Sequence, residues 1–128
     1  MLTPLFAQDP AGFVLWPKGV PPSKEGAKFE NHVLGITHRD KSGVAELHEK
    51  QTDIFVIQSG ETTLVVGGEL IDAKSTGPGE VRGSGIRGGV KKSVAPGDVV
   101  HIPAKMPHQF FLDPGNEITY VAIKVDML

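Results

Sequence analysis

Polar side chains precede and open an apolar run that is typical of a buried strand. Residues 46–60 read ELHEKQTDIFVIQSG, in which Ile54 to Ile57 are apolar, whereas Glu46, His48 and Asp53 are ionisable. Burial of a carboxylate or an imidazole is costly unless the group is paired. Alternate side chains of a strand share a face, so Glu46 and His48 should point the same way. If the chain returns antiparallel after the sequence EKQT, Asp53 comes within reach of His48.

A second histidine opens an apolar strand further along the chain. In PGDVVHIPAKMPHQF, residues 96–110, the sequence PGD forms a turn. His108 then begins a strand whose face it shares with Phe110 and Leu112. A single histidine is seldom a ligand, but two strand-opening sets of carboxylate and histidine favour a shared binding site. His101 alternates with apolar neighbours and should face away from them, at the surface or an interface.

The composition suits one soluble domain. The chain has 128 residues, of which 39% are hydrophobic and 22% charged, so it is neither disordered nor embedded in a membrane. A net charge of −2 does not indicate the excess of positive charge that binds nucleic acid or an anionic membrane. No apolar run approaches the roughly 20 residues of a spanning helix. The absence of cysteine excludes disulfides, thiolate metal ligands and a cysteine nucleophile. We therefore expect neither nucleic acid nor a membrane as a partner.

Short β-branched and aromatic segments, separated by turn residues, predict an all-β fold. The segments are HVLGITHRD, VAELHE, DIFVIQSGETTLVVGG, VVHIP, HQFFLD and ITYVAIKV. Their spacing is that of strands in a sandwich or barrel. The pair Gly67-Gly68 suits a hairpin turn. No segment has a sustained apolar period of 3.6 residues, so helix should stay below about a tenth of the chain, against a usual third.

Residues 72–91 depart from this pattern because they contain six glycines and few apolar side chains. We predict a long loop here, with one short strand around Val81 to Ile86. Loops of this length in compact domains tend to be functional or mobile. Arg82 and Arg87 in this segment are candidates for contact with an anionic group, or serve solubility.

The first polar segment resembles a motif of the cupin family, whose members are small jelly-roll β-barrels that hold a divalent metal ion inside the barrel. The motif is G-x5-H-x-H-x3,4-E-x6-G, and residues 46–60 fit its spacing. Glu46 stands at the first histidine position, His48 at the second and Asp53 at the acidic position. The resemblance covers roughly residues 33–125 and implies an all-β, antiparallel jelly-roll barrel with little helix.

The second polar segment resembles the family's second motif, G-x5-P-x-G-x2-H-x3-N. Gly97, Pro103 and His108 fit this motif, whereas Lys105 replaces its glycine and Leu112 its asparagine. Both motifs occur in the order that the family has.

The resemblance implies that the polar side chains of this cluster are paired with a divalent metal ion. His48, Asp53 and His108 would supply two histidines and a carboxylate, a ligand type that suits Mn, Fe, Zn or Ni with open positions. Glu46 would be a fourth ligand, an acceptor that orients His48, or a catalytic base that acts on bound water. In the alternative, the barrel holds no metal and its polar residues are hydrogen-bonded through water.

Three functions fit the resemblance. The first is a metal-dependent enzyme of the isomerase, lyase or dioxygenase type, acting on a small polar molecule inside the barrel; the fold does not choose among these reactions. The second is a non-catalytic barrel that binds a small molecule or a carbohydrate, with or without metal. The third is a structural or regulatory barrel without a ligand.

The N-terminal part is predicted to be an extension of the barrel. We expect residues 1–28 to form the extension and residues 29–128 the barrel. The sequence MLTPLFAQDP has a small-residue stop at Ala7-Gln8, so residues 1–8 are either a remnant of a secretory signal or an ordinary terminus. The protein would be periplasmic or secreted in the first case and cytoplasmic in the second. Jelly rolls leave sheet edges that must be covered, and the apolar sequence AGFVLWP can cover a partner's edge, so we expect a homodimer.

Overall fold

The computed structural model describes residues 8–128. The predicted signal remnant lies, apart from Gln8, outside the described residues. The division between an extension and a barrel at residues 28 and 29 stays a prediction. Within the described range, none of the helical segments has the length and hydropathy of a transmembrane helix.

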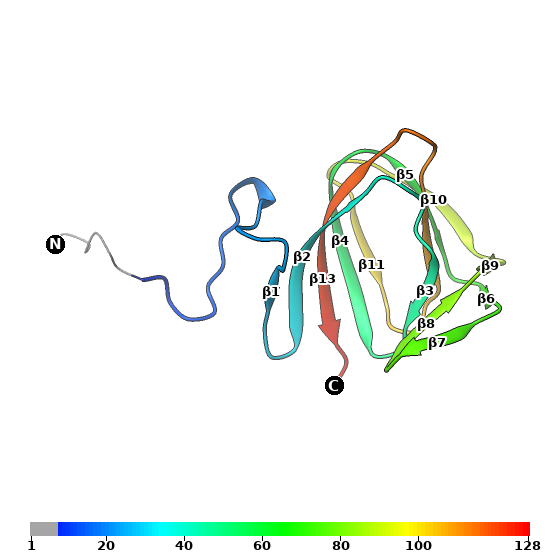
Figure 1. Cartoon of the computed structure of the whole chain (residues 1–128), viewed down its shortest axis with the longest axis horizontal. Helices are drawn as coiled ribbons and strands as arrows, with labels where there is room; N and C mark the ends of the chain where they lie inside the picture. Colours follow the sequence, from blue (N-terminus) through cyan, green and yellow to red (C-terminus); the bar gives the residue numbers. More distant parts are fainter. Residues whose placement is uncertain (1–7) are drawn as a thin grey trace.

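Two antiparallel sheets face each other and enclose the interior (Figure 1). The first sheet has the strand order β1-β2-β13-β4-β11. Its strands are β1 (Ala27–Lys28), β2 (His32–Arg39), β4 (Gln51–Ser59), β11 (Val99–Ile102) and β13 (Ile118–Asp126).

The second sheet has the order β10-β5-β12-β3-β8-β7, and β6 and β9 form a small sheet of their own. The second sheet comprises β3 (Ala45–His48), β5 (Thr62–Val66), β7 (Lys74–Gly77), β8 (Glu80–Gly83), β10 (Val90–Val94) and β12 (His108–Phe111). The small sheet comprises β6 (Glu69–Ile71) and β9 (Gly85–Arg87). Strands make up 53% of the structure and helix 2%, the latter from one short 3-10 turn, Pro17–Gly19. The predicted all-β, antiparallel barrel with little helix is confirmed.

Side chains along β4 alternate between the interior and the outer face, because successive strand residues point to opposite sides. Asp53, Phe55 and Ile57 are buried, whereas the residues between them are only partly so. The register of β4 with β13 places Lys124 opposite Asp53. Asp53 therefore begins an inward row that continues with apolar side chains, and the polar residues gather at one end of the interior.

Apolar side chains fill the rest of the interior. The rings of Phe55, Phe110 and Tyr120 pack against one another with centroids 4.7 to 5.6 Å apart, the spacing that aromatic pairs prefer. Around them lie the other members of the core, which are Ile57, Leu64, Val94, Ile102, Ile118 and Ala122. This packing excludes water behind the polar end.

Strands β3 and β4 do not form the antiparallel return that the sequence predicted. They belong to opposite sheets, and the chain crosses between the sheets through Glu49 and Lys50. The N–H of Glu49 donates to the carbonyl of Gly79 at 2.8 Å, which fixes the crossing. Asp53 consequently reaches His48 across the interior and not across a ladder of hydrogen bonds.

The hairpin predicted at Gly67-Gly68 is also wrong. Strand β5 pairs with β10 and β12, whereas β6, which follows the two glycines, pairs with β9. Both glycines have positive φ angles, 81° and 71°, and a Cβ on Gly68 would lie 2.3 Å from the carbonyl oxygen of Arg87. The pair therefore turns the chain out of one sheet and into the small sheet.

The long loop predicted for residues 72–91 is wrong. The segment contains β7, β8 and β9 and the start of β10, with a break at Ser84 between β8 and β9. Strand β7 is at the end of its sheet and β8 is next to it. Glycine-rich strands in such places bury little surface, so they need no apolar period and resemble a loop in sequence. Strand β8 pairs with β3 and thereby brings its polar side chains to the predicted site.

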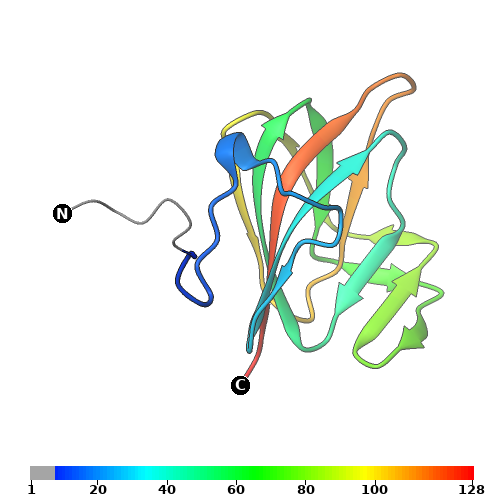
Figure 2. The same ribbon diagram turned by 60° about the vertical axis from the view of Figure 1, so that its left-hand side comes forward.

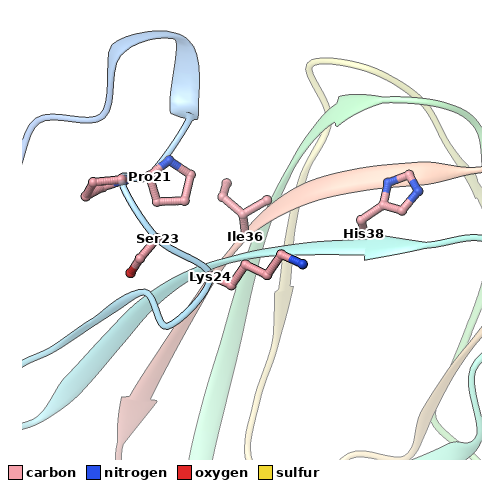
Figure 3. A pocket seen from close by; sticks show the side chains of 6 residues that line it. Pro21, Ser23, Lys24, Ile36 and His38 are labelled. Carbon is pink, nitrogen blue, oxygen red and sulfur yellow. The ribbon is translucent and has the colours of Figure 1, made fainter.

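The segment before β1 runs along the outer side of the first sheet (Figure 2). The side-chain amide of Gln58 on β4 donates to the carbonyl of Lys18 at 3.5 Å. A surface hollow of about 550 Å³ lies between this segment and β2 (Figure 3). It is lined by Pro21, Pro22, Ser23, Lys24, Ile36 and His38.

Candidate metal centre

Four predicted site residues converge at the polar end of the interior. Glu46 and His48 lie on β3 and His108 lies opposite Glu46 on β12, in the second sheet, whereas Asp53 projects from β4 in the first sheet. Asp53 Oδ2 lies 3.2 Å from Nε2 of His48 and 3.5 Å from Nε2 of His108. Glu46 Oε1 lies 3.3 Å from Nε2 of His108 and 3.7 Å from Nε2 of His48. One donor atom each from Glu46, His48 and His108 lies within 4.8 Å of the others, and Asp53 adjoins this set of three.

Hydrogen bonds on the far side of each imidazole ring fix which nitrogen faces the cluster. Nδ1 of His108 donates to the carbonyl of Met106 at 3.1 Å, and a carbonyl can only accept. Nδ1 of His48 donates to Oε2 of Glu80 at 2.5 Å. When the rings are neutral, each Nε2 carries a lone pair that points at the cluster, which is the arrangement that metal-binding histidines have, and Nζ of Lys124 lies 3.4 Å from Nε2 of His48.

Each carboxylate of the cluster is held by a cation from the neighbouring strand. Nη1 of Arg82, whose residue lies opposite Glu46 in the register of β3 and β8, is 3.0 Å from Oε2 of Glu46. Nζ of Lys124, from β13, is 2.8 Å from Oδ1 of Asp53. Each cation engages one oxygen of its carboxylate and leaves the other, Glu46 Oε1 or Asp53 Oδ2, to face the imidazoles.

Burial and charge act in opposite directions on these carboxylates. Burial alone would raise the pKa of Glu46, but the contact with His108 and the charges of His108, Arg82 and His48 outweigh it and lower the pKa. Burial likewise opposes ionisation of Asp53, and its contacts with His48 and Lys124 lower its pKa. The contact with the Asp53 carboxylate raises the pKa of His48 against the effect of burial, and Glu80 adds to the rise. Both carboxylates are therefore anionic at neutral pH.

Two donor atoms of the cluster are buried without a hydrogen-bond partner among the described residues. They are Oδ2 of Asp53 and Nε2 of His108, whose side chains are only 1% and 2% exposed. Buried polar atoms are nearly always paired, so each such atom requires an explanation. A cation between these two atoms, which lie 3.5 Å apart, would engage both lone pairs. The donor set, two imidazole nitrogens and two carboxylate oxygens, suits Mn, Fe, Zn or Ni.

Glu46, His48, Asp53 and His108 come together as predicted from the sequence, whereas the residues that contact them were not predicted. Glu80 and Arg82 lie in the segment predicted as a loop, where the sequence offers Arg82 for contact with an anionic group or for solubility. Lys124 was overlooked, although a signal existed: Tyr120, Ala122 and Lys124 alternate along one strand, so this lysine shares the face of two buried residues. His101 is exposed, as predicted.

No protein-family model matches the chain, and no curated protein matches it significantly in sequence. Solved structures do match. The chain is similar to a conserved protein with a double-stranded β-helix domain from Klebsiella pneumoniae, with a TM-score of 0.59, 13% identity and 91% of each chain covered. It is also similar to a cupin protein from Bacteroides fragilis, with a TM-score of 0.51, 18% identity, and 77% of this chain and 68% of that chain covered. The chain has a cupin fold.

A third similar structure is the polyketide cyclase RemF from Streptomyces resistomycificus, with a TM-score of 0.52 and 20% identity. The match covers 76% of this chain but spans only 56% of the cyclase. Sequence identities of this size establish the cupin fold, and they leave the activity to be argued from the site.

The hydrogen bond between His48 and Glu80 yields a prediction. Glu80→Ala removes the acceptor that holds the Nδ1 proton, so Nε2 of His48 should bind metal less well. Loss of such a partner typically lowers metal affinity by about 10- to 100-fold. Competition with a chromophoric chelator would measure the change for Zn²⁺. Glu49→Ala removes an exposed carboxylate one residue from His48 and should leave the affinity unchanged; equal affinities for the two variants would contradict the assigned role of Glu80.

Proposed function

We propose that this cupin binds one divalent metal ion, Mn, Fe, Zn or Ni, through Glu46, His48, Asp53 and His108, and that it is an enzyme acting on a small polar molecule. One observation carries the proposal: the buried lone pairs of Asp53 Oδ2 and His108 Nε2 face each other without a partner among the residues described. A direct hydrogen bond between these two atoms would need a hydrogen atom on one of them. The hydrogen bond from His108 Nδ1 to a carbonyl places the ring's single proton elsewhere.

The protein groups prepare the site in three ways. Glu80 and the Met106 carbonyl orient the two imidazoles, and Arg82 and Lys124 each hold one carboxylate oxygen. The aromatic core excludes water on the inner side. When bound, a divalent ion would supply Lewis acidity, which polarises a substrate oxygen or lowers the pKa of water.

A ligand reaches the site at its rim, because apolar side chains fill the interior beyond the donors. The side chains of Glu80, Arg82 and Lys124 are each 35% exposed, whereas those of His48, Asp53 and His108 are nearly buried. The substrate therefore meets charged groups before it meets the donors.

The role of Glu46 has two readings. Its Oε1 faces both imidazoles and its Oε2 contacts Arg82, which supports the ligand reading. As the most exposed donor, with a side chain 17% exposed, it is also the one best placed to take a proton from a bound molecule.

The alternative function is a non-catalytic barrel that binds a small molecule or a carbohydrate at the same site. The charged residues at the rim of the site, Glu80, Arg82 and Lys124, favour neither catalysis nor simple binding. A panel of polar metabolites, screened first for binding to the metal-loaded protein and then for turnover, separates them: ligands that bind and are recovered unchanged would favour the binding barrel.

We also propose a homodimer. The segment before β1 carries large apolar side chains that its own barrel leaves open to solvent: Phe13 is 53% exposed, Leu15 71% and Val20 66%. Burial of exposed apolar side chains of this size against a second copy would be favourable.

Metal content tests the proposed ligands. The double change His48→Ala with His108→Ala should abolish metal binding, measured by elemental analysis of protein purified without chelator, while the strand spectrum persists. Because a metal that binds only the native state adds about 3 to 4 kcal/mol at a hundred- to a thousand-fold excess over its dissociation constant, the variant should also melt at a lower temperature. The matched double change at the exposed residues His38 and His101 should keep full metal content. Metal retained by the first variant would overturn the proposed site.

Glu46→Gln distinguishes the two roles of Glu46. If Glu46 is a ligand, a neutral amide replaces a carboxylate on a dication, so metal affinity should fall. If it is a base, metal affinity should stay and turnover should collapse, because the amide cannot accept a proton. We expect the first result. Glu46→His, which restores the family's residue, should keep or tighten the binding of Ni or Zn, since both suit imidazole.

Light scattering tests the dimer. At micromolar concentration, the particle should have twice the chain mass of 13.7 kDa, and Phe13→Ser with Leu15→Ser should shift it toward the monomer because the apolar contact is lost. A wild-type particle of 13.7 kDa would rule out the dimer.

A further inference from the structure

We propose that the molecule bound at the metal centre is a small carboxylate, and that Lys124 selects it. The inference rests on the proposed function, because it concerns a ligand that shares the site with the metal. It deepens that function by naming the class of the ligand and the side chain that recognises it.

The position of Lys124 is the first argument. Its ammonium comes from the first sheet and lies 2.8 Å from Oδ1 of Asp53 and 3.4 Å from Nε2 of His48. Both residues belong to the donor set, so a molecule that binds beside them meets this ammonium. An ammonium has three N–H donors and no acceptor. Asp53 engages one of them, and His48 can no longer accept from another once its Nε2 lone pair is bound to metal. Lys124 therefore retains donors for a second, negatively charged partner.

Arg82 is less free to serve as this contact. Its Nη1 lies between two carboxylates, 3.0 Å from Oε2 of Glu46 and 3.9 Å from Oε2 of Glu80. Both contacts are made by Nη1, so Arg82 has two carboxylate partners. Lys124 has one carboxylate partner among the described residues, and its side chain is as exposed as that of Arg82, at 35%.

The charge of the site is the second argument. Five ionised side chains surround the two imidazoles, which are neutral when they bind a metal ion: the carboxylates of Glu46, Asp53 and Glu80 and the cations Arg82 and Lys124. Three negative charges against two positive ones leave a net charge of one negative. A divalent ion reverses this to one positive. A ligand with a single negative charge then neutralises a partly buried site, whereas a neutral sugar or alcohol leaves the positive charge uncompensated.

Binding of matched small molecules to the metal-loaded protein tests the proposal without an assay of activity. Acetate and acetamide have the same shape and differ in charge. In protein loaded with Co²⁺, at constant ionic strength, the visible spectrum should respond to acetate at concentrations at least about tenfold lower than to acetamide, the ratio expected for one charge-assisted hydrogen bond. Inorganic phosphate provides the test of another oxyanion and should bind less well than acetate. Equal response to acetate and acetamide, or preference for phosphate, would overturn the proposed class.

Variants of Lys124 test its role. Lys124→Gln keeps an N–H donor for Asp53 but removes the charge, so acetate should bind about 10- to 100-fold more weakly. The affinity for Co²⁺ should stay or increase, since a positive charge beside the dication is lost. Lys124→Arg should restore acetate binding, and Lys91→Gln, at an exposed lysine of β10, should change neither affinity.

The outcomes separate this proposal from the proposed function. Wild-type protein that binds no Co²⁺ would contradict the metal centre itself. Wild-type protein that binds Co²⁺ while Lys124→Gln binds acetate normally would overturn only the role of Lys124. Loss of Co²⁺ from Lys124→Gln would also overturn that role, because Lys124 would then be a structural partner of Asp53.

Discussion

Lone pairs of two imidazoles and two carboxylates face one another at the end of the barrel, and this crowding of electron-pair donors constrains the surrounding structure. Without a cation, Oδ2 of Asp53 and Nε2 of His108 are buried and have no hydrogen-bond partner within residues 8–128, a state that is costly in a protein interior. The donors come from opposite sheets, so only the closure of the barrel brings Asp53 to the imidazoles. The fold and the site therefore depend on each other.

The charged groups of the site lie at two depths, with carboxylate oxygens beside the imidazoles and cations nearer the rim. Each cluster carboxylate turns one oxygen to a cation on the adjacent strand and the other to the imidazoles. Contacts with His108 and Arg82 keep Glu46 ionised despite its burial, and contacts with His48 and Lys124 do so for Asp53. The division between the two oxygens also separates two tasks, since the inner oxygens can bind a metal while the outer cations face the rim. A site with the donors alone would carry an uncompensated buried negative charge.

Strand periodicity predicted much of this arrangement, and its failures have physical causes. The alternation of Glu46 with His48, and of His108 with Phe110, correctly predicted which side chains face inward, because one face of a barrel strand must be buried. It failed for residues 72–91, since glycine-rich strands at or next to the end of a sheet do not need an apolar face. Glu80 and Arg82 were missed for that reason. Local patterns also did not reveal that β3 and β4 lie in different sheets, because the pairing of strands depends on contacts distant in sequence. The cupin resemblance supplied the overall fold that local patterns could not.

X-ray absorption at the zinc edge of the loaded protein tests the central claim most directly, because it reports the atoms around the ion without reference to activity. The account predicts one Zn²⁺ per chain with two imidazole nitrogens at about 2.0 to 2.1 Å and carboxylate oxygens completing the shell. The imidazole rings should be visible through their outer-shell scattering, and that scattering should disappear in protein lacking His48 and His108. A shell of oxygen atoms alone, or an imidazole signal that persists in that variant, would contradict the account.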